Sequence, residues 1–124
     1  MKVIHTASAA LLGAAVIFSA CATTPPPPSA EMTRAKAAIE QAQRAGAREY
    51  ATEYLNASME KLDLAEAASA KGNNASATRL VEESYADAHL AQISAQSAKS
   101  AKAAADVDKS IQTLQHEANR ANSQ

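Results

Sequence analysis

All four prolines of the chain lie together at Pro25–Pro28, and the sequence from Ser29 to Gln124 contains none. Proline interrupts helices, so a long segment without it leaves helix formation unopposed. Alanine, the strongest helix former, supplies most of the apolar residues there, and the β-branched runs typical of strands are missing. The sequence therefore predicts an all-α body after Pro28.

Glycines divide the first part of this body into two expected helices. The first runs from residue 29 to about residue 45, with Ser29 as its N-cap and Gly46 as its C-terminal stop. The second runs from about residue 52 to about residue 71 and is closed by Gly72. Each carries a stripe at three- and four-residue spacing: Met32, Ala35, Ile39 and Ala42 in the first, and Leu55, Met59, Leu62, Ala65 or Glu66, and Ser69 in the second.

Asn73 or Asn74 caps a third helix, and nothing interrupts its pattern until about Arg120. At 1.5 Å per residue, such a helix of about 45 residues is near 68 Å long, whereas the first two cover at most about 30 Å each. They can pack against only its first half. We expect an antiparallel helical hairpin or three-helix bundle from which the long third helix projects.

The third helix carries two stripes, as a helix with two neighbours requires. The first stripe consists of Ala77, Val81, Ser84, Ala88, Ala91, Ala95 and Ala98. The second begins with Ala86, Leu90 and Ile93 and continues through Ser97, Ser100, Ala104, Val107, Ile111, Leu114, Ala118 and Ala121.

The second half of this helix has no expected partner within the chain. Its stripe keeps a strict heptad-like spacing with small residues, a pattern typical of closely approaching helices. Two interpretations stay open. Either the helix is solvated and frays after about residue 100, or it self-associates or docks onto another envelope protein through Val107, Ile111 and Leu114.

The N-terminal residues 1–20 have the layout of a signal peptide. A short positive region containing Lys2 is followed by a mostly apolar, uncharged stretch and by the small residues Ser19 and Ala20. This stretch is short for a membrane span, which needs about 20 apolar residues. An uncleaved anchor is the alternative interpretation.

The junction Phe18-Ser19-Ala20-Cys21 resembles the lipobox of bacterial lipoproteins, although Phe18 stands where leucine is usual. The resemblance implies cleavage between Ala20 and Cys21 and acylation of Cys21, with chains such as palmitate. Ala22, rather than aspartate, implies an outer-membrane destination facing the periplasm. Two or more acyl chains make membrane attachment effectively stable. An incidental buried Cys21 is the competing interpretation.

Residues 21–28 then form the lipidated cysteine and a linker. Four consecutive prolines favour a polyproline II conformation, which extends about 3.1 Å per residue. We expect a stiff spacer of roughly 12 Å between the membrane and the helices.

No catalytic or metal site is expected. The sole cysteine is assigned to lipid, and His89 and His116 lie about 40 Å apart on one helix, too far to share a metal. The acidic residues of the third helix have basic neighbours at helical spacing and are interpreted as solvated. A net charge of −1 without tryptophan disfavours nucleic-acid binding. Neither a cofactor nor a small-molecule substrate is predicted.

Residues 31 to about 98 resemble a family of small bacterial lipoproteins grouped as domain of unknown function 4398 (DUF4398). The matching residues are Ala37-Ala38, Ala42, Gly46-Ala47, Tyr50-Ala51, Leu55, Ala57, Lys61-Leu62, Ala65, Ala67-Ala68, Gly72, Ala77, Leu80 and Tyr85–Ala91. Thr52 stands where that family often has proline. The resemblance implies a helical, hairpin-like envelope domain over residues 29–98, with residues 99–124 as an extension, and it supplies no catalytic residues.

We therefore expect a non-enzymatic, lipid-anchored cell-envelope protein with a structural or adaptor role through helix–helix contacts. The alternative is a helical bundle that binds a lipid or a cell-wall fragment. That function requires a lined cavity of roughly a few hundred Å³. Closely packed alanine-rich helices leave little room for one.

Overall fold

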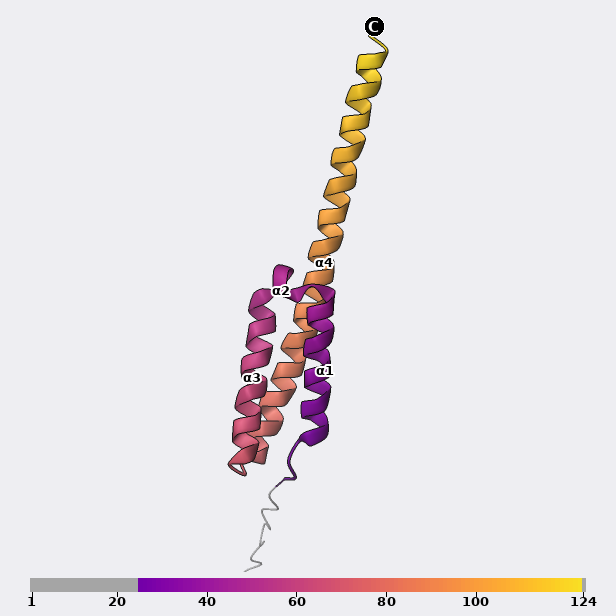
Figure 1. The fold of residues 1–124 in the computed structure, drawn as a ribbon. Coiled ribbons are helices and arrows are strands. Elements are labelled where there is room, and N and C mark those ends of the chain that lie inside the picture. The colour runs from indigo at the N-terminus through magenta and orange to yellow at the C-terminus, as the bar shows by residue number, and fades with distance from the viewer. Residues whose placement is uncertain (1–24, 124) are drawn as a thin grey trace, which may run out of the picture.

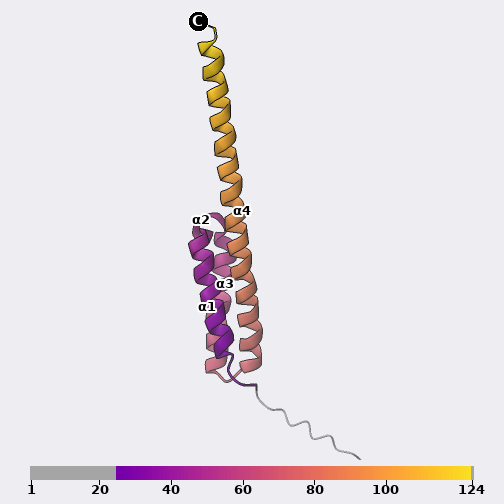
Figure 2. The same ribbon diagram turned by 90° about the vertical axis from the view of Figure 1, so that its right-hand side faces the viewer.

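The computed structural model describes residues 25–123, which form helices and no strand. The elements are α1 (Ser29–Ala45), α2 (Ala47–Tyr50), α3 (Thr52–Ala70) and α4 (Asn74–Ala121). Figures 1 and 2 show α1 and α4 running in the same direction and α3 running against both. The predicted all-α, three-helix bundle is confirmed.

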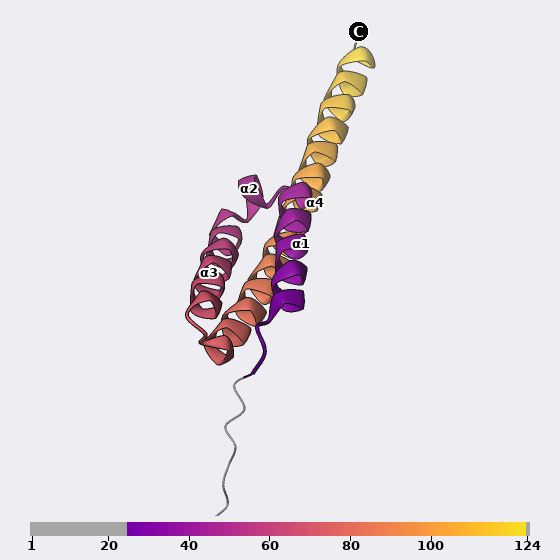
Figure 3. The same cartoon turned by 60° about the horizontal axis from the view of Figure 1, so that its bottom comes forward.

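The third long helix is far longer than the two that pack on it. α4 has 48 residues, while α1 has 17 and α3 has 19. At 1.5 Å per residue these correspond to about 72, 26 and 29 Å. In Figures 1 and 3, the first half of α4 lies against α1 and α3, and its second half extends well beyond them. The predicted projecting helix is confirmed, and it is continuous to Ala121.

Glycines follow the ends of α1 and α3, and an asparagine caps the start of α4, as the chemistry of these residues predicts. Gly46 follows α1 with a φ of 99°, and its N–H donates to the carbonyls of Ala42 and Gln43. Gly72, with a φ of 75°, follows α3. The side chain of Asn73 accepts a hydrogen bond of 3.3 Å from the backbone N–H of Ser76, which makes it the N-cap of α4.

The prediction of Ser29 as an N-cap was wrong, because Ser29 is the first residue of α1 itself. The carbonyl of Pro28 already accepts the first helical hydrogen bond, at 3.0 Å from the N–H of Met32. Pro28 is therefore the boundary residue, and it carries no side-chain oxygen that could cap the helix.

The short helix α2 was not predicted. It is a single turn, closed by hydrogen bonds from the N–H of Tyr50 to the carbonyl of Gly46 and from that of Ala51 to Ala47. One turn is too short to show an apolar periodicity, so the sequence pattern gives no signal for it. α2 buries Ala47 and directs the chain from the end of α1 to the start of α3.

The core is built mainly from alanine, and Val81, Ser58 and Ser84 are the largest fully buried side chains among the described residues. α1 and α3 each lie along α4 and contact each other less. The buried apolar residues are Ala35, Ala38, Ile39, Ala42, Ala47, Ala51, Leu55, Leu62, Ala65, Ala77, Val81, Ala88, Ala91 and Ala95. Small side chains allow the helix axes to approach closely. This matters on α4, because both α1 and α3 pack against the same face of that helix.

Two expectations about the buried faces were wrong. On α3, Met59 is 42% exposed and Ser58 is fully buried instead, because the close contact with Ser84 of α4 admits only a small side chain. On α4, the second stripe is not buried, and Leu90 and Ile93 are 42% and 60% exposed. The first stripe consists mostly of alanine, and these small side chains leave room for both α1 and α3 to pack on that one face of α4.

Polar contacts link each pair of long helices. Lys36 of α1 lies 2.7 Å from Glu66 of α3. Lys61 of α3 lies 2.7 Å from Asp87 of α4. Arg34 of α1 makes a cation–π contact with Tyr85 of α4. The guanidinium carbon lies 4.4 Å from the centre of the Tyr85 ring.

Candidate functional site: the outward face of α4

The most extensive exposed apolar feature of the described residues is one face of α4, which we name the α4 stripe. Successive members are separated alternately by three and four residues, so they follow a single side of the helix. It consists of Leu90, Ile93, Ser97, Ser100, Ala104, Val107, Ile111 and Leu114. All eight residues are exposed.

The α4 stripe points away from the bundle. Ile93 is two residues, or about 200° of helical rotation, from each of Ala91 and Ala95. Both alanines are fully buried against α1 and α3, whereas Ile93 is exposed. One side of α4 therefore builds the core, and the opposite side is free along its length.

The α4 stripe continues past the end of the bundle without a break. Lys99 marks that end, because its Nζ donates a 3.3 Å hydrogen bond to the carbonyl of Ala45 at the end of α1. From there to Ala121 the helix extends about 33 Å. Val107, Ile111 and Leu114 lie on this part and are 58%, 46% and 70% exposed. An exposed line of large apolar residues joined by small ones, as on this helix, is a candidate interaction surface.

Charged side chains are concentrated away from the α4 stripe. Lys102 and Asp106 lie 3.6 Å apart on the bundle side of the helix. The positions that flank the stripe on either side are His89, Ser94, Gln96, Ala101, Ala103, Asp108, Ser110, Gln115 and Glu117. Because most of these are small or uncharged, another helix could approach closely at little electrostatic cost.

The structure thus places the three residues predicted to bind a partner, Val107, Ile111 and Leu114, on one solvent-facing line. Leu90 and Ile93 were not predicted to belong to this surface, because their stripe was expected to contact a neighbouring helix of the bundle. The sequence signal for these two residues is the three- and four-residue spacing, which continues unbroken across residue 98. A face that continues past the end of the bundle is not formed to pack against α1 or α3.

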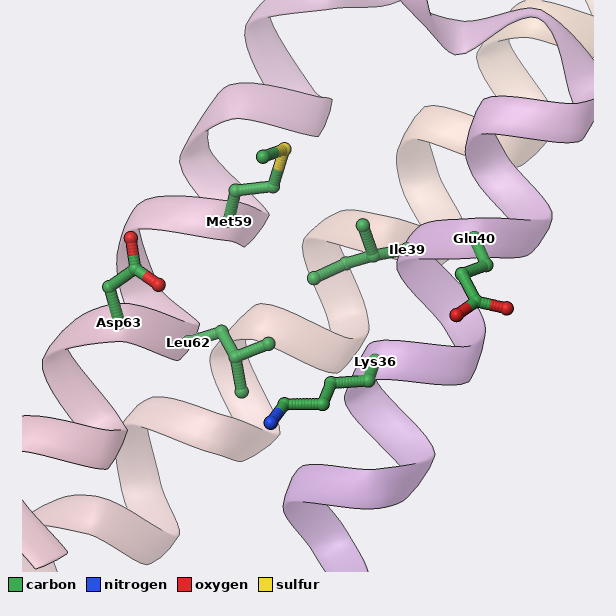
Figure 4. Close-up of a pocket in the computed structure, with 6 residues that line it drawn as sticks. All are labelled: Lys36, Ile39, Glu40, Met59, Leu62 and Asp63. Carbon is green, nitrogen blue, oxygen red and sulfur yellow. The ribbon is translucent and has the colours of Figure 1, made fainter.

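A second candidate is a groove between α1 and α3 with a volume of about 250 Å³. Figure 4 shows Ile39 and Leu62 pointing into the space between the two helices, with Lys36 reaching across from α1. Small-molecule sites usually enclose roughly 300–1,000 Å³. The groove is smaller, and the ion pair between Lys36 and Glu66 spans the same two helices.

The titratable side chains form contacts expected of a scaffold. The His89 ring packs edge-on against Tyr85, with ring centres 4.6 Å apart. Glu83 lies 3.0 Å from Arg79 and 3.4 Å from Lys61. Across residues 25–123, no group of three or more His, Cys, Asp or Glu side chains is arranged to hold a metal ion.

The predicted lipidation and cleavage residues, Cys21 and Ala20, lie outside the described residues. Among the helices that are described, none combines the length and apolar character needed to cross a membrane.

A family model described as a domain of unknown function (DUF4398) matches residues 30–107, well over half of the chain. The chain belongs to this family. The match covers α1, α2 and α3 and continues along α4 to Val107, so it includes much of the α4 stripe of this DUF4398 protein. No curated protein and no solved structure matches the chain.

Proposed function

We propose that this DUF4398 protein is a non-enzymatic, lipid-anchored protein of the bacterial outer membrane, facing the periplasm. In this proposal it serves as a structural or adaptor element whose working surface is the α4 stripe. The observation that carries the proposal is the exposed apolar face that runs along α4 from Leu90 to Leu114, on the side opposite the core.

The arrangement of the two ends supports this role. The side-chain amide of Asn74 donates a 2.7 Å hydrogen bond to the carbonyl of Pro25, so the linker meets the bundle where α4 begins. The projecting end of α4 lies at the opposite end of the molecule (Figure 1). Acylation of Cys21, four residues before Pro25, would hold the bundle near the membrane and direct the free half of α4 away from it.

Crosslinking in cells tests the adaptor role. A photo-reactive side chain at Ile111 or Leu114 is expected to give a discrete crosslinked product. The same group at Gln112, which is exposed on another face of α4, is the matched control and should give none. Products of equal yield from all three positions, or from none, would contradict a role for the α4 stripe.

Membrane attachment is tested separately at Cys21. Replacing Cys21 by Ser removes the only thiol that can be acylated. We expect this variant to lose acyl labelling and to leave the membrane fraction. Labelling or membrane retention equal to that of the unchanged chain would refute the proposed anchor.

A further inference from the structure

We propose that the partner of the α4 stripe is the same stripe of a second copy of this chain, with the two helices antiparallel and related by a two-fold axis near Lys102. This inference rests on the proposed function in one respect, because both use the α4 stripe as the binding surface. The inference adds which molecule binds there and in which register.

The length of the α4 stripe limits what can cover it. From Leu90 to Leu114 it extends about 36 Å, part along the bundle and part beyond it. α1 and α3 reach only about 26 and 29 Å, and both are already packed on the other side of α4. Among the described elements, only α4 itself is long enough to cover the whole stripe.

The side-chain sizes along the α4 stripe are arranged symmetrically. Large residues stand at one end, Leu90 and Ile93, and again at the other end, Ile111 and Leu114. The residues between them are mostly small. The midpoint between Leu90 and Leu114 is Lys102, which lies on another face. Apart from Ser97 and Val107, which differ in size, the pattern is the same in both directions, so it is self-complementary about a two-fold axis, as an isologous interface demands.

One antiparallel register matches the four large end residues of the stripe with one another and leaves Val107 opposite the smaller Ser97. It pairs Leu90 with Leu114, Ile93 with Ile111, Ser97 with Val107, and Ser100 with Ala104 of the other copy. A shift of one heptad would instead place Leu114 opposite Ser97. Small residues at the centre allow the two helices to approach closely, and each large pair fills the space toward an end.

The flanking residues are compatible with this register. His89 of one copy lies beside Glu117 of the other, and Asp108 lies beside Ser94. No two like charges meet across the seam. In a parallel pair in register, His89 would lie beside Ser94 and Glu117 beside Asn122, so the complementary pair would be lost. α1 and α3 do not obstruct either copy, because they occupy the opposite side of α4.

Disulfide trapping tests both the occupant and its direction, in a full chain whose only natural thiol is removed by Cys21→Ser. A mixture of chains carrying Leu90→Cys and chains carrying Leu114→Cys should form a mixed disulfide in high yield. Each variant alone should form little, because its two thiols would lie about 36 Å apart. The matched control is a mixture of Gln92→Cys and Gln112→Cys. In the proposed register these two positions lie at the same level along the helix axes, but on other faces of α4, so they should not crosslink.

Efficient disulfides from each single variant alone would indicate a parallel pair and overturn the antiparallel register. Sedimentation gives an independent measurement. The chain should be a dimer, Ile111→Asp should be a monomer with unchanged helix content, and Gln112→Asp should remain a dimer. A monomeric unchanged chain without mixed disulfides would overturn the inference of a second copy.

These results separate this inference from the proposed function. A monomeric chain whose Ile111 crosslinks to a different protein in cells would remove the second copy and leave the adaptor role standing. A monomeric chain with no crosslink in cells would remove both.

Discussion

At the residue scale, the contact between α3 and α4 is fixed by two buried serines. The hydroxyl of Ser58 donates to the carbonyl of Ser84 at 2.7 Å, and the hydroxyl of Ser84 donates to the carbonyl of Ser58 at the same distance. Both side chains are fully buried. This reciprocal pair satisfies each hydroxyl only when the two residues lie directly opposite each other, so it sets the register of the two helices.

We expect Ser58→Ala and Ser84→Ala each to lower the free energy of unfolding by about 1 kcal/mol, the net value of one hydrogen bond. The double variant should lose less than the sum, because the two hydroxyl oxygens also lie 3.2 Å apart and interact. Urea unfolding measures these values. Ser110→Ala, exposed on α4 and not a member of the α4 stripe, is the control for helix propensity. If Ser58→Ala and Ser110→Ala proved equally stable, the reciprocal pair would have no role in stability.

Lys61 links the same two helices through charge. Its hydrogen bond with Asp87 raises the pKa of Lys61 above the ordinary value of 10.5, and Glu83 adds to this shift, although desolvation opposes it. The Asp87 Oδ2 atom that faces it is itself buried. A raised pKa in the folded state means that the ion pair contributes its full stability below about pH 10.5 and loses it as pH rises further.

We expect Lys61→Met, which keeps the aliphatic part of the side chain, to unfold at lower urea concentration than the unchanged chain at about pH 9. That difference should shrink at a second pH well above 10.5, because Lys61 of the unchanged chain loses its proton as the pH passes its raised pKa. Lys102→Met is the control, because the Lys102–Asp106 pair is exposed and should matter little at either pH. A difference that is the same at both pH values would argue against a charge effect.

At the element scale, the first half of α4 depends on small side chains. Ala91 is fully buried between helices, whereas Ala105 stands two heptads later on the same side of α4 and is exposed. We expect Ala91→Leu to lower the free energy of unfolding by about 1–3 kcal/mol through overpacking. Ala105→Leu should change it by less than about 0.5 kcal/mol. Thermal unfolding of both variants measures the contrast, and equal stability would mean that the alanine seam is not close-packed.

The sequence predicted those parts of the fold that depend on local chemistry. Gly46, Gly72 and Asn73 end or begin helices because of their own conformational or hydrogen-bonding preferences. The length of α4 follows from the absence of glycine and proline after Gly72. Local patterns could not reveal that Ser58, rather than Met59, faces α4, because that choice depends on how closely two helices approach.

The candidate site was predicted only in part for a similar reason. A heptad spacing shows which residues share a face, but it does not show which face a neighbour covers. Val107, Ile111 and Leu114 were identified because no neighbour could reach them. Leu90 and Ile93 were expected to contact a neighbouring helix because the sequence does not show that both neighbours fit on one alanine-rich side.

At the scale of the whole molecule, the bundle and the projecting half of α4 have separate roles in stability. The buried residues of α4 end at Ala95, and every residue from 99 to 123 is exposed. We expect a chain that ends after Val107 to keep its free energy of unfolding within about 0.5 kcal/mol under conditions where both chains are monomeric. Its helical circular dichroism signal should fall in proportion to the residues removed.

A chain that ends after Ala88 is the contrasting variant, because it lacks the buried Ala91 and Ala95. We expect it to lose cooperative unfolding. If the shorter cut after Val107 had the same effect, the projecting half would be part of the folding unit and the division into two roles would be wrong.

The hydrogen bond between Asn74 and Pro25 has a mechanical consequence, because it lies at one extreme of a rigid rod. A rotation of the bundle by about 10° about that point would move the far end of α4 by roughly 12 Å, given a helix of about 72 Å. The length of α4 therefore amplifies any change in the angle at which Pro25–Pro28 meets the bundle, and Leu114 would move much farther than the residues near Asn74.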